Sequence, residues 1–117
     1  MERIFKAFLN SLHALKYLLR HEKAVIQEAV LFIISIPVAL YITKDWRSFL
    51  LLTGSILFVM IVEILNTAIE ATCNAITHDY REDIKIAKDA GSLAVLLSII
   101  LAIGIWGWIT IKTVFSF

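Results

Sequence analysis

The sequence contains few residues that could cross-link or sharply bend it. Its 117 residues include one cysteine, Cys73, one proline, Pro37, and four glycines. A single cysteine excludes an intrachain disulfide and any metal site built from the cysteines of one chain. The scattered glycines exclude a glycine-rich phosphate loop of the Walker type and a dinucleotide fingerprint.

Charge is also scarce and nearly balanced. Charged residues make up 18% of the chain, and the formal net charge is +1. No basic patch is interleaved with aromatic residues, so we expect no nucleic-acid partner. The three histidines, His13, His21 and His78, do not have metal-ligand spacing, and no Ser/His/Asp arrangement can be argued.

Apolar residues dominate the chain, at 60% of the total. A helix needs roughly 20 residues to cross a hydrocarbon core. Three apolar runs, at about 28–43, 48–77 and 90–117, are read as such helices, the first of them short and the second long. We therefore expect an all-α integral membrane protein with a single domain, 1–117. No small-residue cleavage pattern ends the first run, so we expect no removable signal peptide.

Residues 1–27 predict an amphipathic helix on the membrane surface. The apolar face carries Ile4, Phe5, Phe8, Leu12, Leu15 and Leu19. The opposite face carries Arg3, Lys6, Asn10, His13, Lys16 and Arg20. This pattern is typical of a helix that lies in the lipid boundary with its cationic side toward anionic headgroups.

Loop charge predicts the orientation of the spans. Basic residues concentrate in the N-terminal segment and in the connector 78–89. By the positive-inside rule both are cytoplasmic, and the C-terminus is outside. Trp106 and Trp108 are expected to anchor the third run at the far interface, and the small residues Ala87 and Gly91 are expected to let another helix approach closely.

The segment 63–74 places polar side chains inside the second apolar run. At about 100° per residue, Glu70 and Asn74 lie roughly 20° to either side of Glu63. Asn66 and Thr67 lie within about 60° of the same stripe. An ionised carboxylate at the bilayer centre costs roughly 2.5–3.5 kcal/mol, so two carboxylates on one face require partners, water or a metal.

This polar stripe leaves three interpretations open: catalysis, conduction of ions or protons by a small oligomer, and structural hydrogen bonding between helices. In the catalytic interpretation, Glu22, Glu70, Lys88 and Asp89 lie near the cytoplasmic surface, where carboxylates and a lysine suit a magnesium nucleotide. The deeper Glu63 suits a general base acting on a lipid hydroxyl. We expect an oligomer, because three helices offer little interior to shelter two carboxylates.

Two motifs resemble a known family. The run Glu63-Ile-Leu-Asn-Thr-Ala-Ile-Glu70, followed by Ala87-Lys88-Asp89-Ala-Gly-Ser92-Leu-Ala-Val-Leu96, closely resembles the signature of the small bacterial membrane diacylglycerol kinases. That family also includes undecaprenol kinases. The resemblance covers nearly the whole chain, and the Lys-Asp-x-Gly-Ser form with Asp79-Tyr80 is more similar to the diacylglycerol branch.

The resemblance implies a homotrimer of three-span subunits in the bacterial inner membrane, with shared active sites at the cytoplasmic face. Its expected activity is ATP-dependent phosphorylation of diacylglycerol to phosphatidic acid, with undecaprenol as the alternative acceptor. The resemblance implies that Glu63 is the catalytic base and that Glu22 and Glu70 bind the metal of MgATP. It gives nucleotide contacts to Arg3, Asp79, Tyr80, Arg81, Lys88 and Asp89. It gives the lipid site to Arg3, Gln27, Glu28 and Ser92, and Asn66 supports Glu63.

The chain departs from the family pattern at a few positions. Asn74 stands where the family usually carries aspartate, which puts a supporting polar contact in question. Asn10 and Leu19 replace aromatic residues, and Ile26 replaces a basic one. Because the residues that match the catalytic set are present, we expect activity to survive.

Overall fold

The structure, a computed structural model, describes residues 1–115 and consists of four α-helices joined by short connectors. The helices are α1 (Glu2–His21), α2 (Lys23–Ile42), α3 (Trp46–Ile76) and α4 (Glu82–Phe115). By length and composition, α2, α3 and α4 can each cross a membrane. The expectation of an all-α, multi-pass membrane protein is confirmed. The last two residues of the third predicted run, 116–117, lie outside the described residues.

Two of the helices begin earlier than the apolar runs suggested. Helix α2 begins at Lys23 rather than near residue 28, so Gln27 and Glu28 lie in its first two turns. Helix α4 begins at Glu82, inside the charged connector, and so contains Lys88 and Asp89. Polar residues at these ends continue the helix because the end turns lie beyond the apolar core of each span. Four predicted site residues, Gln27, Glu28, Lys88 and Asp89, are thereby placed on helices rather than on loops.

The helix ends follow local chemistry. Glu22 adopts an extended conformation, with φ −108° and ψ 104°, and separates α1 from α2. Asp45 caps α3: its Oδ2 accepts a hydrogen bond from the Ser48 N–H at 3.0 Å, which satisfies one of the unpaired amides of the first turn. Asp45 lies outside the spans, and the Ser48 hydrogen bonds hold the pKa of its carboxyl below the ordinary value.

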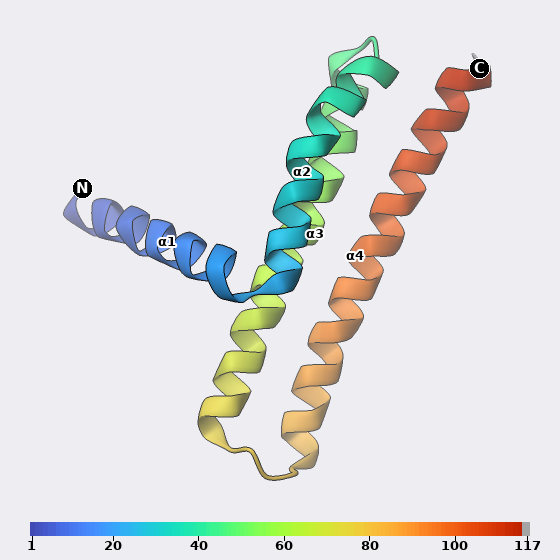
Figure 1. Cartoon of the computed structure of the whole chain (residues 1–117). Helices are drawn as coiled ribbons and strands as arrows, with labels where there is room; N and C mark the ends of the chain where they lie inside the picture. The colour runs from blue at the N-terminus through green and yellow to red at the C-terminus, as the bar shows by residue number, and fades with distance from the viewer. Residues whose placement is uncertain (116–117) are drawn as a thin grey trace.

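Figure 1 shows α2, α3 and α4 running roughly along one direction, with α1 standing away from them as an arm. At 1.5 Å per residue, α2 is about 30 Å long and α3 about 46 Å. Because a tight connector joins them at one end, α3 continues about 16 Å past the junction of α1 and α2. Helix α4 accompanies it, and the α3–α4 connector closes this projecting end.

Two side-chain contacts fix the antiparallel packing of α3 and α4. Gly91 faces Asn66, where an added Cβ would overlap Oδ1 and approach Cγ to 3.2 Å. The prediction that Gly91 lets a helix approach closely is confirmed. Nearer the other end, the Trp106 Nε1–H donates to the Leu52 carbonyl at 3.0 Å and to Ser55 Oγ at 3.1 Å. The indole of Trp106 therefore joins two helices, a role that its prediction as an interface anchor did not include.

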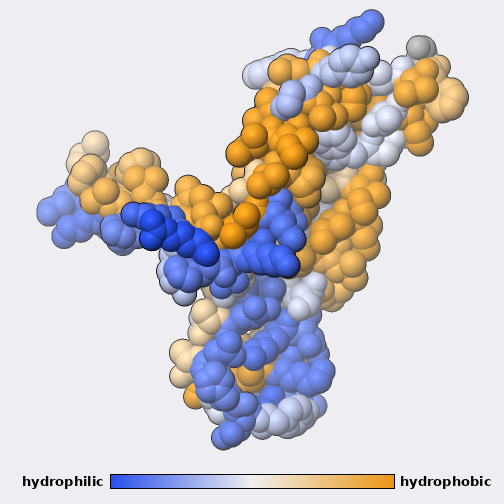
Figure 2. Space-filling view, viewed as in Figure 1, coloured by the Kyte–Doolittle hydropathy of each residue, from blue (hydrophilic) through white to orange (hydrophobic). Residues whose placement is uncertain are grey.

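Much of the apolar surface of the single chain remains uncovered. Figure 2 shows a broad hydrophobic surface over the spans and a hydrophilic surface over the projecting α3–α4 end. Ile33 and Ile103, in the middle of two spans, are 65% and 66% exposed. Among the described residues, the large side chains that are completely buried are Leu52 and Val25. The spans must therefore be covered by lipid or by other copies of the chain.

Candidate active site

The polar stripe predicted on α3 is present and lies near the level where α1 meets the bundle. At 1.5 Å per residue, Glu63 is about 26 Å and Glu70 about 36 Å from the Trp46 end of α3. Because α2 is about 30 Å long, Glu63 falls about one turn short of its Lys23 end and Glu70 falls beyond it. Glu63 is half-buried, whereas Glu70 is exposed on the projecting part.

Asn66 links the stripe internally. Its Nδ2–H donates to Glu70 Oε1 at 3.3 Å, one turn further along the helix. The Thr67 hydroxyl donates to the Glu63 carbonyl at 3.0 Å. In this arrangement the amide of Asn66 binds Glu70, whereas the resemblance implied that Asn66 supports Glu63. Asn66 is only 8% exposed, so the contact is shielded from water on one side.

The acidic side chains near the junction interact with one another. Glu63 interacts electrostatically with Glu70 and with Glu22, and Glu28 interacts with Glu63. We call these four carboxylates, from α2, α3 and the α1–α2 joint, the acid cluster. Like charges repel each other, so a cation, a proton or a cationic side chain would stabilise the cluster.

The residues fit a hard cation in their donor chemistry, although one chain does not complete a site. Mg²⁺ takes oxygen ligands and is usually held by one or two carboxylates together with substrate phosphates. Glu22 and Glu70 offer such oxygens, and Asn66 Oδ1 is a buried oxygen without a hydrogen-bond partner in the described chain. Within residues 1–115, no group of three or more His, Cys, Asp or Glu side chains is arranged to hold a metal.

Lys88 brings a positive charge from α4 to this end of the stripe. Its Nζ donates a hydrogen bond to Asn74 Oδ1 at 2.9 Å, which joins α4 to α3. Asp89, the next residue on α4, pairs with Lys85 one turn earlier, with Nζ and Oδ2 separated by 2.6 Å. Lys88 is therefore the cation that faces the acid-bearing helix, while the charge of Asp89 is offset by its neighbour.

The other predicted nucleotide residues lie at two different distances from the acid cluster. Asp79, Tyr80 and Arg81 occupy the connector at the projecting end, where Tyr80 is 78% exposed and Arg81 pairs with Asp83 at 2.9 Å. Arg3 lies near the free end of α1, about 27 Å along that helix from His21. A single chain thus does not bring Arg3 to its own acid cluster.

The predicted lipid-site residues lie on the helices that flank the junction. Gln27 and Glu28 are in the first turns of α2, and Ser92 is on α4 next to Gly91, which packs against Asn66. Gln27 and Ser92 are exposed on the surface of the single chain. The role of Asn74 as the partner of Lys88 was not predicted, although its position on the polar stripe was the available signal.

Three helices long and apolar enough to span a membrane, with an acid cluster and a facing lysine toward one end, define a small multi-pass membrane protein. Comparison with known proteins narrows this class. Residues 9–110 match the family model described as prokaryotic diacylglycerol kinase. The chain belongs to this family, and the expectation of a diacylglycerol kinase is thereby confirmed.

Curated relatives support the same conclusion. The chain is 41% identical over 104 residues to the protein named diacylglycerol kinase from Escherichia coli K12, which covers 89% of this chain and 85% of that one. It is 32% identical over 99 residues to the diacylglycerol kinase of Haemophilus influenzae, covering 85% and 84%. It is also 32% identical over 109 residues to the diacylglycerol kinase of Pseudomonas aeruginosa, covering 93% and 89%.

Proposed function

We propose that this chain transfers the γ-phosphoryl group of MgATP to the primary hydroxyl of diacylglycerol and produces phosphatidic acid. The observation that carries the proposal is the level of the stripe on α3. Glu63 lies about one turn inside the Lys23 end of α2, and Glu70 lies beyond that end. A lipid hydroxyl at headgroup depth and a nucleotide dissolved in water can therefore meet between these two carboxylates.

In this mechanism Glu63 accepts the proton of the lipid hydroxyl as the oxygen attacks the γ-phosphorus. The bond from the γ-phosphorus to the bridging oxygen of ATP breaks, and ADP leaves with that oxygen. The ammonium of Lys88, held by Asn74, offsets charge on the transferred group. Positioning and electrostatics account for most of the catalysis, as in other phosphoryl transfers.

Glu22 and Glu70 would hold the Mg²⁺ that accompanies ATP. When bound, the ion offsets the charge of the phosphate oxygens. Two carboxylates with phosphate oxygens suit this ion, and Asn66 orients Glu70 through the Nδ2–Oε1 hydrogen bond at 3.3 Å. Asp79, Tyr80, Arg81 and Asp89 lie on the projecting side of Glu70, where they would contact the rest of the nucleotide.

The distant position of Arg3 supports a homotrimer with shared sites. Arg3 is about 27 Å along α1 from the junction, yet it belongs with the nucleotide and lipid residues in the family pattern. An arm of this length reaches the acid cluster of a neighbouring copy more readily than its own. The uncovered apolar residues of the spans offer the surface for such an assembly.

The same geometry supports an orientation in which α1 and the α3–α4 connector lie on the cytoplasmic side of the membrane. Helix α1 would lie flat in the cytoplasmic interface, with its hydrophobic side toward the spans and its hydrophilic side toward the projecting end, as Figure 2 colours them. The α3–α4 connector would then lie in the cytoplasm of a bacterial inner membrane. The basic residues of α1 and of the connector agree with the positive-inside rule.

The test is a phosphoryl-transfer assay with purified protein, radiolabelled ATP and either diacylglycerol or undecaprenol in mixed micelles. Labelled phosphatidic acid with little labelled undecaprenyl phosphate is the expected result. Preferential labelling of undecaprenol would replace the acceptor but keep the reaction class. Absence of any labelled lipid, with the protein shown to be folded, would overturn the proposal and return attention to ion or proton conduction.

A further inference from the structure

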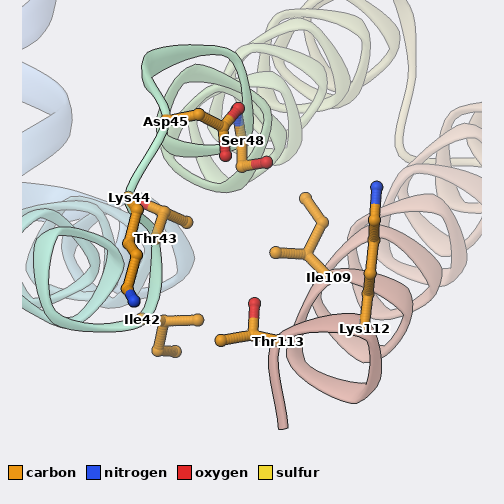
Figure 3. A pocket seen from close by; sticks show the side chains of 8 residues that line it. All are labelled: Ile42, Thr43, Lys44, Asp45, Ser48, Ile109, Lys112 and Thr113. Carbon is orange, nitrogen blue, oxygen red and sulfur yellow. The ribbon is translucent and has the colours of Figure 1, made fainter. Parts of the chain in front are cut away.

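A polar cavity lies at the end of the bundle opposite the acid cluster. Its volume is about 280 Å³, and it lies between the end of α2, the start of α3 and the end of α4. Its polar lining comprises Thr43, Lys44, Asp45, Ser48, Lys112 and Thr113. In Figure 3 the hydroxyl oxygens of Ser48 and Thr113 point into this space, and the side chains of Lys44 and Lys112 flank it on opposite sides.

Positive charge predominates around this cavity. The charged side chains at this end of residues 1–115 are Lys44, Asp45, Arg47 and Lys112. The carboxylate of Asp45 accepts the Ser48 N–H at the start of α3 and also interacts electrostatically with Lys112, so it offsets part of this positive charge. Within the same residues, neither Lys44 nor Lys112 lies within ion-pair distance of a carboxylate. The cavity is therefore complementary to an anionic group.

Aromatic side chains place this end of the bundle at headgroup depth. Tyr41 and Trp46 flank the α2–α3 connector and are 92% and 70% exposed. Tyr and Trp are enriched at membrane–water interfaces, where their rings lie at the level of lipid headgroups. The lysines of the cavity consequently lie where lipid phosphates are found.

Two further hollows, whose linings are more apolar, share lining residues with the cavity. One, of about 170 Å³, shares Ser48 and Lys112 with it and continues along Ile105. The other, of about 270 Å³, shares Lys44 and continues along Phe49. A charged, hydroxyl-lined hollow with more apolar hollows beside it matches the polarity of a phospholipid, which carries a phosphate at one end and acyl chains at the other.

We propose that this cavity binds the phosphate of an anionic phospholipid in the leaflet opposite the active site, with an acyl chain along one of the adjoining hollows. Lys44 and Lys112 offset the charge of the phosphate, and Ser48 and Thr113 donate hydrogen bonds to its oxygens. A zwitterionic lipid binds less well, because its own ammonium group already balances the phosphate. The site is remote from the acid cluster, so it does not depend on the proposed kinase reaction.

In the test, the purified full chain is placed in nanodiscs of phosphatidylcholine with or without phosphatidylglycerol. Native mass spectrometry then measures which lipids remain bound when the chain is released from the nanodiscs. The wild-type chain is expected to retain phosphatidylglycerol in preference to phosphatidylcholine. Lys44→Gln and Lys112→Gln should each lower its affinity about five-fold, and the double variant more. Arg47→Gln is the matched control, because Arg47 lies at the same end but does not line the cavity. It should change the affinity less than two-fold.

Several results would overturn the proposal. Equal loss in Arg47→Gln and Lys112→Gln would show attraction to the surface in general, and full retention by the double lysine variant would show no site. Displacement by soluble glycerol phosphate would identify a site for free phosphate. Cross-linking of two copies through Thr113→Cys, in a Cys73→Ala chain without lipid, would identify a second copy as the occupant. Restored retention in the double Lys→Arg variant would support the proposal.

Discussion

Lys88 on α4 donates a hydrogen bond from Nζ to Oδ1 of Asn74 on α3, across 2.9 Å. The acceptor is a neutral amide, so Lys88 is positioned without having its charge offset at this contact. The departure from the usual aspartate at this position therefore keeps an acceptor oxygen for the lysine. What it removes is a negative charge close to the proposed phosphate site.

Asn74→Asp tests this consequence. The new carboxylate would form an ion pair with Lys88 and would add negative charge near Glu70. Because both effects oppose phosphate binding, the KM for MgATP should rise about three- to ten-fold, with a smaller change in kcat. Steady-state kinetics would measure both constants. Asn10→Asp adds the same charge on α1 and serves as the control, and an unchanged KM in Asn74→Asp would show that Lys88 does not meet the nucleotide.

Glu63→Gln tests the proposed base. Glutamine keeps the size of the side chain but cannot accept the hydroxyl proton, so kcat should fall by about 10²–10⁴. The affinity for MgATP, measured by calorimetry, should remain within about two-fold. Glu82→Gln removes a carboxylate from the same end of the bundle and should leave kcat near the wild-type value. Substantial turnover by Glu63→Gln would exclude a role as base.

Glu70→Ala separates metal binding from proton transfer. The variant loses a carboxylate oxygen that receives the Asn66 Nδ2–H at 3.3 Å, and its affinity for MgATP should fall by at least about ten-fold. Removal of Mg²⁺ with a chelator should lower the nucleotide affinity of the wild-type chain by a similar factor. The chelator should then have little further effect on Glu70→Ala. Equal affinity of the variant and the wild type would contradict metal ligation.

Gly91→Ala tests the close approach of α3 and α4. Its Cβ would overlap Asn66 Oδ1, so the helices must separate or Asn66 must turn, at a cost of about 1–3 kcal/mol. Gly104→Ala is the matched control, because an added Cβ there meets nothing within 4 Å. Unfolding in SDS, followed by circular dichroism, should show a loss of stability only for Gly91→Ala. Adding Asn66→Ala to Gly91→Ala should recover part of that loss.

The Asp45 cap predicts a contribution to stability that depends on pH. The backbone N–H of Ser48 lowers the pKa of Asp45 in the folded chain, so the carboxylate stabilises the start of α3 above its ordinary pKa of 3.8. This contribution should disappear as the pH falls from about that value through the lower pKa of the folded state. Asp45→Asn keeps a capping oxygen but does not titrate, so the difference in melting temperature between wild type and variant should depend on pH only below about pH 4. A constant difference down to pH 2 would contradict this.

Local periodicity was sufficient to predict the polar stripe of α3. Glu63, Glu70 and Asn74 share a face simply because they belong to one helix, and helix geometry is a local property. The same holds for the three spans, whose apolar length is visible along the chain. Which side chain of another helix faces the stripe depends on packing across α3 and α4. The partnership of Lys88 with Asn74 was therefore not predictable from spacing.

Trp106 illustrates the same limit. Its distance along α4 predicted a place near the far interface, but hydropathy does not reveal the direction in which an indole points. In the structure it points inward to Leu52 and Ser55. Arg3 lies about 27 Å along α1 from His21, and in the proposed homotrimer it would reach the acid cluster of another copy of the chain. Motif recognition can place such a residue in a site, whereas the fold of one subunit cannot.

The unequal lengths of α2 and α3 have a consequence for the traffic of substrate and product. With Glu63 at the level of the first turn of α2, a diacylglycerol molecule would reach the proposed base by diffusing sideways within its own leaflet. Its acyl chains would not need to leave the hydrocarbon, and the phosphorylated product would depart by the same lateral route. Turnover by the proposed mechanism would thereby be freed from the slow steps of lipid extraction and transbilayer movement.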